Sequence, residues 1–336
     1  MREKESLPRK AAFWALQLLD YDRFLFSKNR QKQYILTYHG VSTGSKGQFN
    51  NRHLPAKSFE EHLKYIQSNF HVLPLSEVAK FNKGQKSGKP SVAITFDDGF
   101  ENNYSVAAPL LKSYSIPATF FVSAICIEDS DYILWSEVIE IVLSQIDLQS
   151  VTFGGIAFQR KSNSWLNHER QDIYSFIKEL PPDLRDNMLE QLKKDYAFDK
   201  LVKNINSEYF RLMNKKQVEE LSRDKLFEIG SHGYLHYNLP TLSPERCETE
   251  LAKSKMILEE IAGKPIKNFA FPDSDYNADV KRISTKTGYE KMFTENYLLH
   301  EDYNDAHIFN RFSISNNIST PSNFVRMAMR AKEFGF

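Results

Sequence analysis

Short apolar runs alternate with amphipathic segments along most of the chain, and this alternation predicts an α/β fold. Runs rich in β-branched and aromatic residues predict buried strands at 33–38, 91–96, 118–122, 226–230, 267–271, 289–294 and 307–314. Segments with apolar residues at helical spacing lie between most of these strands, at 58–69, 103–114, 215–222, 243–261, 279–287 and 323–332. Such alternation is typical of a mostly parallel sheet, either doubly wound or closed into a barrel. About seven strand–helix units favour a distorted (β/α)7-type barrel.

The alternation is interrupted between about residues 128 and 224. Residues 134–143, 169–178 and 183–196 have the pattern of helices, and Gly154-Gly155 predicts a hairpin turn within 151–159. We therefore expect a mainly helical insertion packed beside the barrel. The sequence leaves open whether this insertion forms part of a substrate cleft.

Residues 1–30 are expected to form an N-terminal helical extension. The apolar run Ala11–Leu19 is too short to span a bilayer and ends at charged residues. Early acidic residues and the lack of a small-residue cleavage site argue against a signal peptide. An amphipathic helix that packs on the domain is favoured over one that lies on a membrane surface. We expect a cytoplasmic protein, with peripheral contact to the inner membrane face through this helix as the alternative.

Composition narrows the class of protein but not its chemistry. The 41% hydrophobic and 26% charged content is typical of a soluble globular protein, and 336 residues are enough for one large domain with insertions or for two modest domains. A net charge of +1 gives no reason to expect a nucleic-acid partner. The two cysteines, Cys126 and Cys247, do not form a disulfide framework and are expected to be ordinary buried thiols.

Polar residues follow the predicted strands at several places. In a barrel, the carboxyl ends of the strands meet at one rim, where active sites lie. A single Asp after a strand is usually a turn residue, and a single histidine is usually only hydrogen-bonded. Their shared location nevertheless predicts one site, formed by His39, Asp97, Asp98, His232, His236 and Asp273.

Two of these segments have the residue types of a metal site. Asp97 and Asp98 are adjacent at the end of an apolar strand, where two carboxylates are costly unless a cation or proton holds them. His232 and His236 are four residues apart and follow another strand. One carboxylate and two imidazoles suit a divalent ion with open positions, which leaves the second carboxylate as a base on water.

Three segments together resemble the motifs of the polysaccharide deacetylase family (NodB homology, carbohydrate esterase family 4). They are Thr95-Phe-Asp-Asp-Gly99, Pro117-Ala-Thr-Phe-Phe-Val122 and His232-Gly-Tyr-Leu-His236, and the resemblance covers roughly 33–125 and 215–315. It implies a deacetylase barrel over 31–336, interrupted by the insertion. It also implies a divalent metal, Zn²⁺ being expected, with Asp98, His232 and His236 as ligands and Asp97 as the general base.

The general acid is less clearly marked. Many relatives carry it in a Leu-x-His motif near the C-terminus, which has no match here, and His300 and His307 are expected on the surface. One branch of the family resembles this chain at Leu36-Thr-Tyr-His-Gly-Val41, and in it the strand-end histidine is a candidate acid. We therefore expect His39 to be the acid. A histidine that only locks the first loop is the equally weighted alternative.

The chain also departs from the family pattern. Gly233 replaces a hydroxyl residue that could brace the histidine loop, and Ala270-Phe-Pro-Asp273 lacks the arginine that would orient the base. Some relatives have a Phe-Ala-Tyr-Pro-type version of this second motif. Asp273, near the presumed oxyanion pocket, either points away or recognises a cationic or hydroxyl-rich substrate. Tyr234 and Trp135 are expected as substrate-binding residues, because aromatic faces stack on sugar rings.

These observations favour a metal-dependent N-deacetylase acting on an acetamido sugar of a cell-surface glycan or its precursor. Because export signals are not evident, a nucleotide- or lipid-linked precursor is preferred over finished polymer. One alternative is a deformylase or other amide hydrolase of a small molecule, using the same site. Another is a non-catalytic carbohydrate-binding barrel, favoured by the missing arginine and Asp273 but opposed by the intact carboxylate–histidine set.

Overall fold

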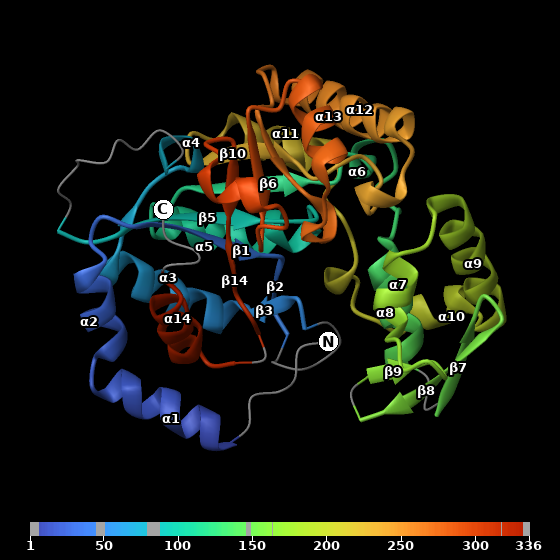
Figure 1. The fold of residues 1–336 in the computed structure, drawn as a ribbon, viewed down its shortest axis with the longest axis horizontal. Helices are drawn as coiled ribbons and strands as arrows, with labels where there is room; N and C mark the ends of the chain where they lie inside the picture. Colours follow the sequence, from blue (N-terminus) through green and yellow to red (C-terminus); the bar gives the residue numbers. More distant parts are fainter. Residues whose placement is uncertain are drawn as a thin grey trace.

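Parallel strands form a nearly closed barrel sheet surrounded by helices (Figure 1). The computed structural model describes residues 7–44, 51–78, 88–145, 149–162, 164–316 and 318–331. Along the sheet the strands follow the order β13 (Ile308–Asn310), β12 (Lys291–Thr294), β11 (Asn268–Ala270), β10 (Phe227–Ser231), β6 (Ala118–Val122), β5 (Ser91–Phe96), β1 (Gln33–Tyr38) and β14 (Phe312–Ser313). A short strand β4 (His71–Val72) pairs with β5. The distorted (β/α)7-type barrel is confirmed.

One stretch of chain joins the two ends of the sheet. The predicted strand 307–314 is divided at Arg311 into β13, which pairs with β12, and β14, which pairs with β1. Both pairings are parallel, so the segment completes the circuit of strands. This places residue 311 inside the rim of the barrel, where it is fully buried.

The central strands and the helices outside them share one large apolar core. β1 and β5 are buried along their whole lengths, as expected for parallel strands covered on both faces. The surrounding helices are α3 (Ala56–Asn69), α4 (Leu75–Val78), α5 (Ala108–Ser113), α6 (Ile125–Glu128), α11 (Lys215–Arg223), α12 (Pro244–Ala262), α13 (Ala278–Lys286) and α14 (Thr320–Met329). Helix α12 shows how local sequence sets such bounds: the Ser243 side chain accepts a hydrogen bond from the backbone N–H of Arg246, and Gly263 ends the helix in the left-handed conformation.

Residues 135–210 form a second unit with its own hydrophobic core (Figure 1). It contains α7 (Trp135–Gln145), β7 (Ser150–Phe153), β8 (Ile156–Lys161), β9 (Ser164–Leu166), α8 (Ile173–Lys178), α9 (Pro182–Asp195) and α10 (Phe198–Val202). The predicted hairpin is present, and both residues of its Gly154-Gly155 turn have positive φ, as a two-residue hairpin turn requires. A third antiparallel strand, β9, was not predicted. Helix α11 instead contributes to the barrel core.

The N-terminal extension consists of two helices, α1 (Leu7–Leu18) and α2 (Tyr21–Lys28), which contact α14 at the side of the barrel (Figure 1). Phe26 is buried against the rings of Tyr34 and Phe70, which ties α2 to the core. No helix within the described residues is long and apolar enough to cross a membrane. Contact with a membrane surface and a cytoplasmic location stay predictions.

Cys126 and Cys247 are both buried and free, as expected. Burial raises the pKa of each thiol to about 12, so neither is a reactive thiolate near neutral pH.

Candidate active site

A cavity of about 340 Å³ opens at the carboxyl ends of the barrel strands. All six residues that the sequence assigned to one site line it: His39, Asp97, Asp98, His232, His236 and Asp273. Its other walls come from the loop before β3 (His53–Pro55), the turns after β11 and β12, the end of β14, and the insertion. The strand-end rule therefore predicted which side chains meet. Their individual chemical roles stay predictions.

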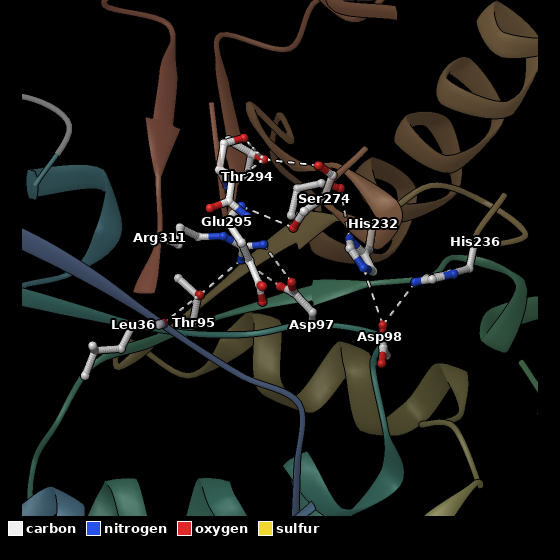
Figure 2. A network of polar contacts seen from close by, with 12 residues as sticks. Leu36, Thr95, Asp97, Asp98, His232, His236, Ser274, Thr294, Glu295 and Arg311 are labelled. Atoms are coloured by element: carbon white, nitrogen blue, oxygen red, sulfur yellow. Dashed lines mark hydrogen bonds and ion pairs between the residues drawn. The ribbon is translucent and has the colours of Figure 1, made fainter. Parts of the chain in front are cut away.

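Asp98, His232 and His236 converge on one point with the geometry of a metal centre (Figure 2). Asp98 Oδ1 lies 3.4 Å from His232 Nε2 and 3.2 Å from His236 Nε2. Ligand atoms of a tetrahedral zinc ion, each about 2.0–2.2 Å from it, are about 3.3 Å apart. All three residues are buried. The donor set, spacing and burial therefore fit a divalent ion.

The electrostatics of this cluster also favour a cation. Burial alone would raise the pKa of Asp98, but hydrogen bonds from His232 and His236 outweigh it and hold that pKa well below its usual range. Burial lowers the pKa of His236, yet the hydrogen bond and charge of Asp98 raise it to about 9. A protonated His236 supplies positive charge beside Asp98, and a bound divalent ion would supply it instead.

The histidine loop is held from behind by side chains and backbone. His232 Nδ1 donates a 2.9 Å hydrogen bond to the carbonyl oxygen of Ala270, which orients the ring so that Nε2 faces Asp98. Nε2 would bind a metal ion once its own proton is lost. Glu250 of α12 accepts hydrogen bonds from the backbone N–H groups of Tyr234 and Leu235. The Ser254 hydroxyl donates to the Gly233 carbonyl. The brace expected to be lost at Gly233 is thus supplied by α12.

Four of the nine non-glycine residues with positive φ in the described part of the chain lie at the same place. Asp98, His236, Asp273 and Ser274 all have φ between 53° and 73°, the left-handed region that most residues avoid. All four line the cavity. Strain of this kind is kept where the surrounding structure holds a residue in a functional position.

Asp97 has a different partner, Arg311, which lies on the side of Asp97 away from Asp98, His232 and His236 (Figure 2). Arg311 donates two hydrogen bonds to the carboxylate, at 2.8 Å to Oδ1 and 2.7 Å to Oδ2, and a third to the Thr95 hydroxyl. Burial raises the pKa of Asp97, but the Arg311 charge and hydrogen bonds, with His232, lower it below its usual value. Asp97 is therefore ionised near neutral pH and fixed in orientation.

The expectation that the orienting arginine is absent was wrong. The family motif has this arginine at the position of Ala270–Asp273. In the structure Arg311, in the segment that joins the two ends of the sheet, bonds Asp97 instead. The available signal was an arginine inside a predicted strand at 307–314, since a charged residue in a buried strand needs a partner.

His39 lines the cavity between β1 and β2 (Gly40–Ser42). Its backbone carbonyl accepts a 2.6 Å hydrogen bond from Asn103, and a side chain at Gly40 would overlap the His53 ring. These contacts fix the loop that carries His39.

We expect His39→Ala to lower kcat for amide hydrolysis by roughly 10²-fold or more, since a general acid contributes about 10²–10⁴-fold. Metal content should stay unchanged, because His39 is not among the three ligand residues. Steady-state kinetics and zinc analysis check this, with the exposed His307→Ala as control. An unchanged rate would show that His39 is not the general acid and only stabilises its loop.

Two predicted substrate-binding residues do not line the cavity. Trp135 is buried in the core of the insertion, because its indole packs among apolar side chains behind the Tyr174 ring, 6.5 Å away. Tyr234 turns outward, where its hydroxyl bonds Glu128 and its ring lies 3.7 Å from the Lys253 Nζ atom. Their assignment to direct stacking on a sugar is corrected. His300 and His307 are exposed, as expected.

Comparison with known proteins decides the family. The polysaccharide deacetylase family model matches residues 84–180 and 187–292. The Bacillus subtilis (strain 168) protein YxkH, whose name places it among polysaccharide deacetylases, is 30% identical over 82% of this chain and 68% of its own length. The chain belongs to the polysaccharide deacetylase family. It is therefore a hydrolase that acts on amide bonds, and deacetylases of this family are metal-dependent in general.

Other known proteins are similar to this chain in part of the sequence or in the fold. The poly-beta-1,6-N-acetyl-D-glucosamine N-deacetylase of Staphylococcus aureus is 38% identical over 79 residues, which are 23% of this chain and 27% of that enzyme. The Streptococcus pyogenes deacetylase PplD, solved with acetate, has a TM-score of 0.57 at 20% identity over 88% of this chain and 97% of that one. IcaB from Ammonifex degensii has a TM-score of 0.54 at 19% identity, over 90% and 97% of the two chains. The two structures support the barrel fold.

Proposed function

We propose that this polysaccharide deacetylase is a metal-dependent N-deacetylase that removes acetyl from an acetamido sugar of a cell-surface glycan or its precursor. One observation carries the proposal: the two adjacent carboxylates have different partners. Asp98 faces two histidines, whereas Asp97 is held by Arg311. That division suits one metal ligand and one base. The similarity to the Staphylococcus aureus enzyme supports an N-acetylated sugar as the substrate.

Each side chain then has a role in hydrolysis of the amide. Asp98, His232 and His236 would hold a divalent ion, Zn²⁺ in this proposal, which supplies a Lewis acid and lowers the pKa of a nearby water. Asp97 accepts the proton of the water that attacks the acetyl carbonyl. His39 gives a proton to the nitrogen as its bond to the carbonyl carbon breaks. Collapse of the intermediate gives acetic acid and an amine; the acid passes its proton to the amine, so the products are acetate and the ammonium form of the amino sugar. The proton on Asp97 returns through water to His39, which restores both groups.

A deformylase, or another amide hydrolase of a small molecule, would use the same catalytic groups. The chemistry of Asp97 and His39 does not distinguish an acetyl from a formyl group. The choice between finished polymer and a nucleotide- or lipid-linked precursor also lies in substrate recognition. Both questions need a substrate panel rather than a mutant.

The deciding experiment measures metal and product together. We expect about one zinc ion per purified chain and release of acetate from at least one N-acetylated sugar. Chelation should abolish this activity and re-addition of Zn²⁺ should restore it, while His232→Ala should lose both metal and turnover. The exposed His307→Ala serves as control. Turnover that survives complete metal removal, or release of formate but not acetate from matched substrates, would contradict the proposal.

A further inference from the structure

The insertion contributes two polar side chains to the wall of the cavity. They are Glu140 on α7 and Tyr174 on α8. On the same turn of α7, Ile139 and Ile141 are buried in the core of the insertion. Glu140 lies between them in sequence and is turned toward the cavity instead. The insertion therefore presents a polar pair, one residue from each of two helices, to the active site.

The two side chains form a hydrogen-bonded unit. The Tyr174 hydroxyl donates to Glu140 Oε2. Both side chains are half-buried, and the partial burial raises the pKa of each group. Glu140 Oε1 and the phenolic oxygen keep lone pairs that can accept further hydrogen bonds. Because both residues line the cavity, a ligand with hydrogen-bond donors can reach these lone pairs.

An ion pair anchors this wall to the barrel. Arg52, in the loop before β3, forms an ion pair with Glu137 on α7. The side chain of Glu137 is fully buried. The Ser136 hydroxyl donates a 2.7 Å hydrogen bond to the same carboxylate. Because Glu137 and Glu140 are three residues apart on one helix, Arg52 fixes the face of α7 that points into the cavity. The position of the pair is thus set by the fold.

We propose that Glu140 and Tyr174 form a subsite that accepts hydrogen bonds from ring hydroxyl groups of the sugar whose acetamido group is hydrolysed. The subsite makes the insertion a specificity element of the barrel. The inference rests on the proposed N-deacetylase function. A sugar carries several hydroxyl donors at fixed spacing, which match two adjacent acceptors on a rigid wall. Asp273 adds a carboxylate to the same cavity, and its Oδ2 is buried without a hydrogen-bond partner among the described residues.

Substitution at either residue should weaken recognition without changing the chemistry: Glu140→Gln exchanges one acceptor oxygen for an NH₂ donor, and Tyr174→Phe removes the phenolic oxygen. Glu140→Gln and Tyr174→Phe should each raise KM for an oligomer of β-1,6-linked N-acetylglucosamine by roughly tenfold or more, because a site built for a hydroxyl discriminates strongly. The value of kcat and the zinc content should stay at wild-type levels. Hydrolysis of 4-nitrophenyl acetate, which has no sugar, should be unaffected. Glu190→Gln and Tyr196→Phe, in the same insertion but away from the cavity, are the controls.

Deoxy analogues of N-acetylglucosamine test the wild-type protein directly, independently of how the variants fold. For the wild-type protein, the analogue that lacks the recognised hydroxyl should have a higher KM than the parent sugar. The variants should bind this analogue and the parent sugar equally.

Unchanged KM in both variants, or no deoxy analogue discriminated by wild type, overturns the subsite and leaves the proposed function intact. If the wild-type protein hydrolyses 4-nitrophenyl acetate but accepts no N-acetylated sugar, both the subsite and the proposed function are overturned.

Discussion

Replacement of Asp97 by asparagine is expected to lower kcat for acetate release by about 10²- to 10⁴-fold, the usual contribution of a general base. Asparagine keeps the shape of the side chain and can still accept a hydrogen bond from Arg311, but it cannot take a proton from water. The metal content should be unchanged, since Asp97 is not among the three residues whose ligand atoms converge. Acetate release and zinc analysis on the same preparation check both halves of this expectation.

The control for Asp97→Asn is Asp279→Asn, which removes an exposed carboxylate at the start of α13. A denaturation curve is also needed, because the substitution leaves the buried Arg311 guanidinium without its charged partner. A folded, zinc-loaded Asp97→Asn protein that turns over at the wild-type rate would remove Asp97 from the mechanism.

The strands of this fold could be predicted closely because their signal is local. β1 and β6 have the same bounds in the sequence prediction and in the structure, since each is a continuous apolar run in a fully buried parallel strand. The site could be located for a related reason. Once the strands are parallel, topology alone brings their carboxyl ends to one rim, so residues far apart such as Asp98 and His232 meet without any local signal.

The partners of the site residues could not be predicted, because they depend on tertiary packing. Arg311 is 214 positions from Asp97 in the sequence, and only the closure of the barrel by β13 and β14 brings the two together. Tertiary packing also explains why Trp135 and Tyr234 do not line the cavity, although the sequence suggested them as substrate-binding residues. Both residues were selected partly because they lie near motifs in the sequence. In the structure Trp135 packs into the core of the insertion, and Tyr234 points outward to Glu128.

The departures from the family motifs are compensated in space. Gly233 has no hydroxyl to brace the histidine loop, but Glu250 and Ser254 of α12 bond that loop. The motif at 270–273 has no arginine, but Arg311, between β13 and β14, bonds the Asp97 carboxylate. A motif comparison counts both positions as losses, whereas the physical requirement is only that some side chain makes the contact. The missing arginine therefore no longer favours a non-catalytic barrel, which leaves Asp273 as the remaining argument for it.

Arg311→Lys is expected to lower kcat/KM by about 10²-fold and to shift its pH dependence. Lysine keeps the positive charge but cannot make the bidentate contact, and a misplacement of about 1 Å at a catalytic group can cost 10²-fold. Arg311 lowers the pKa of Asp97 against the effect of burial, so weakening it raises that pKa. A base works only when ionised, that is, above its pKa. The acidic limb of the profile should thus move to higher pH, with larger losses at pH 5 than at pH 8.

The matched control for Arg311→Lys is Arg282→Lys, which changes an exposed ion pair on α13. Arg311→Met extends the series, because it removes the charge as well and should move the acidic limb further than lysine does. It also leaves Asp97 buried without a cation, so its free energy of unfolding should fall by about 3–5 kcal/mol. A lysine variant with reduced activity but an unshifted pH profile would separate orientation of Asp97 from control of its pKa. A variant with unchanged kcat/KM would show that the bidentate contact, although buried and well aligned, is not required by the base.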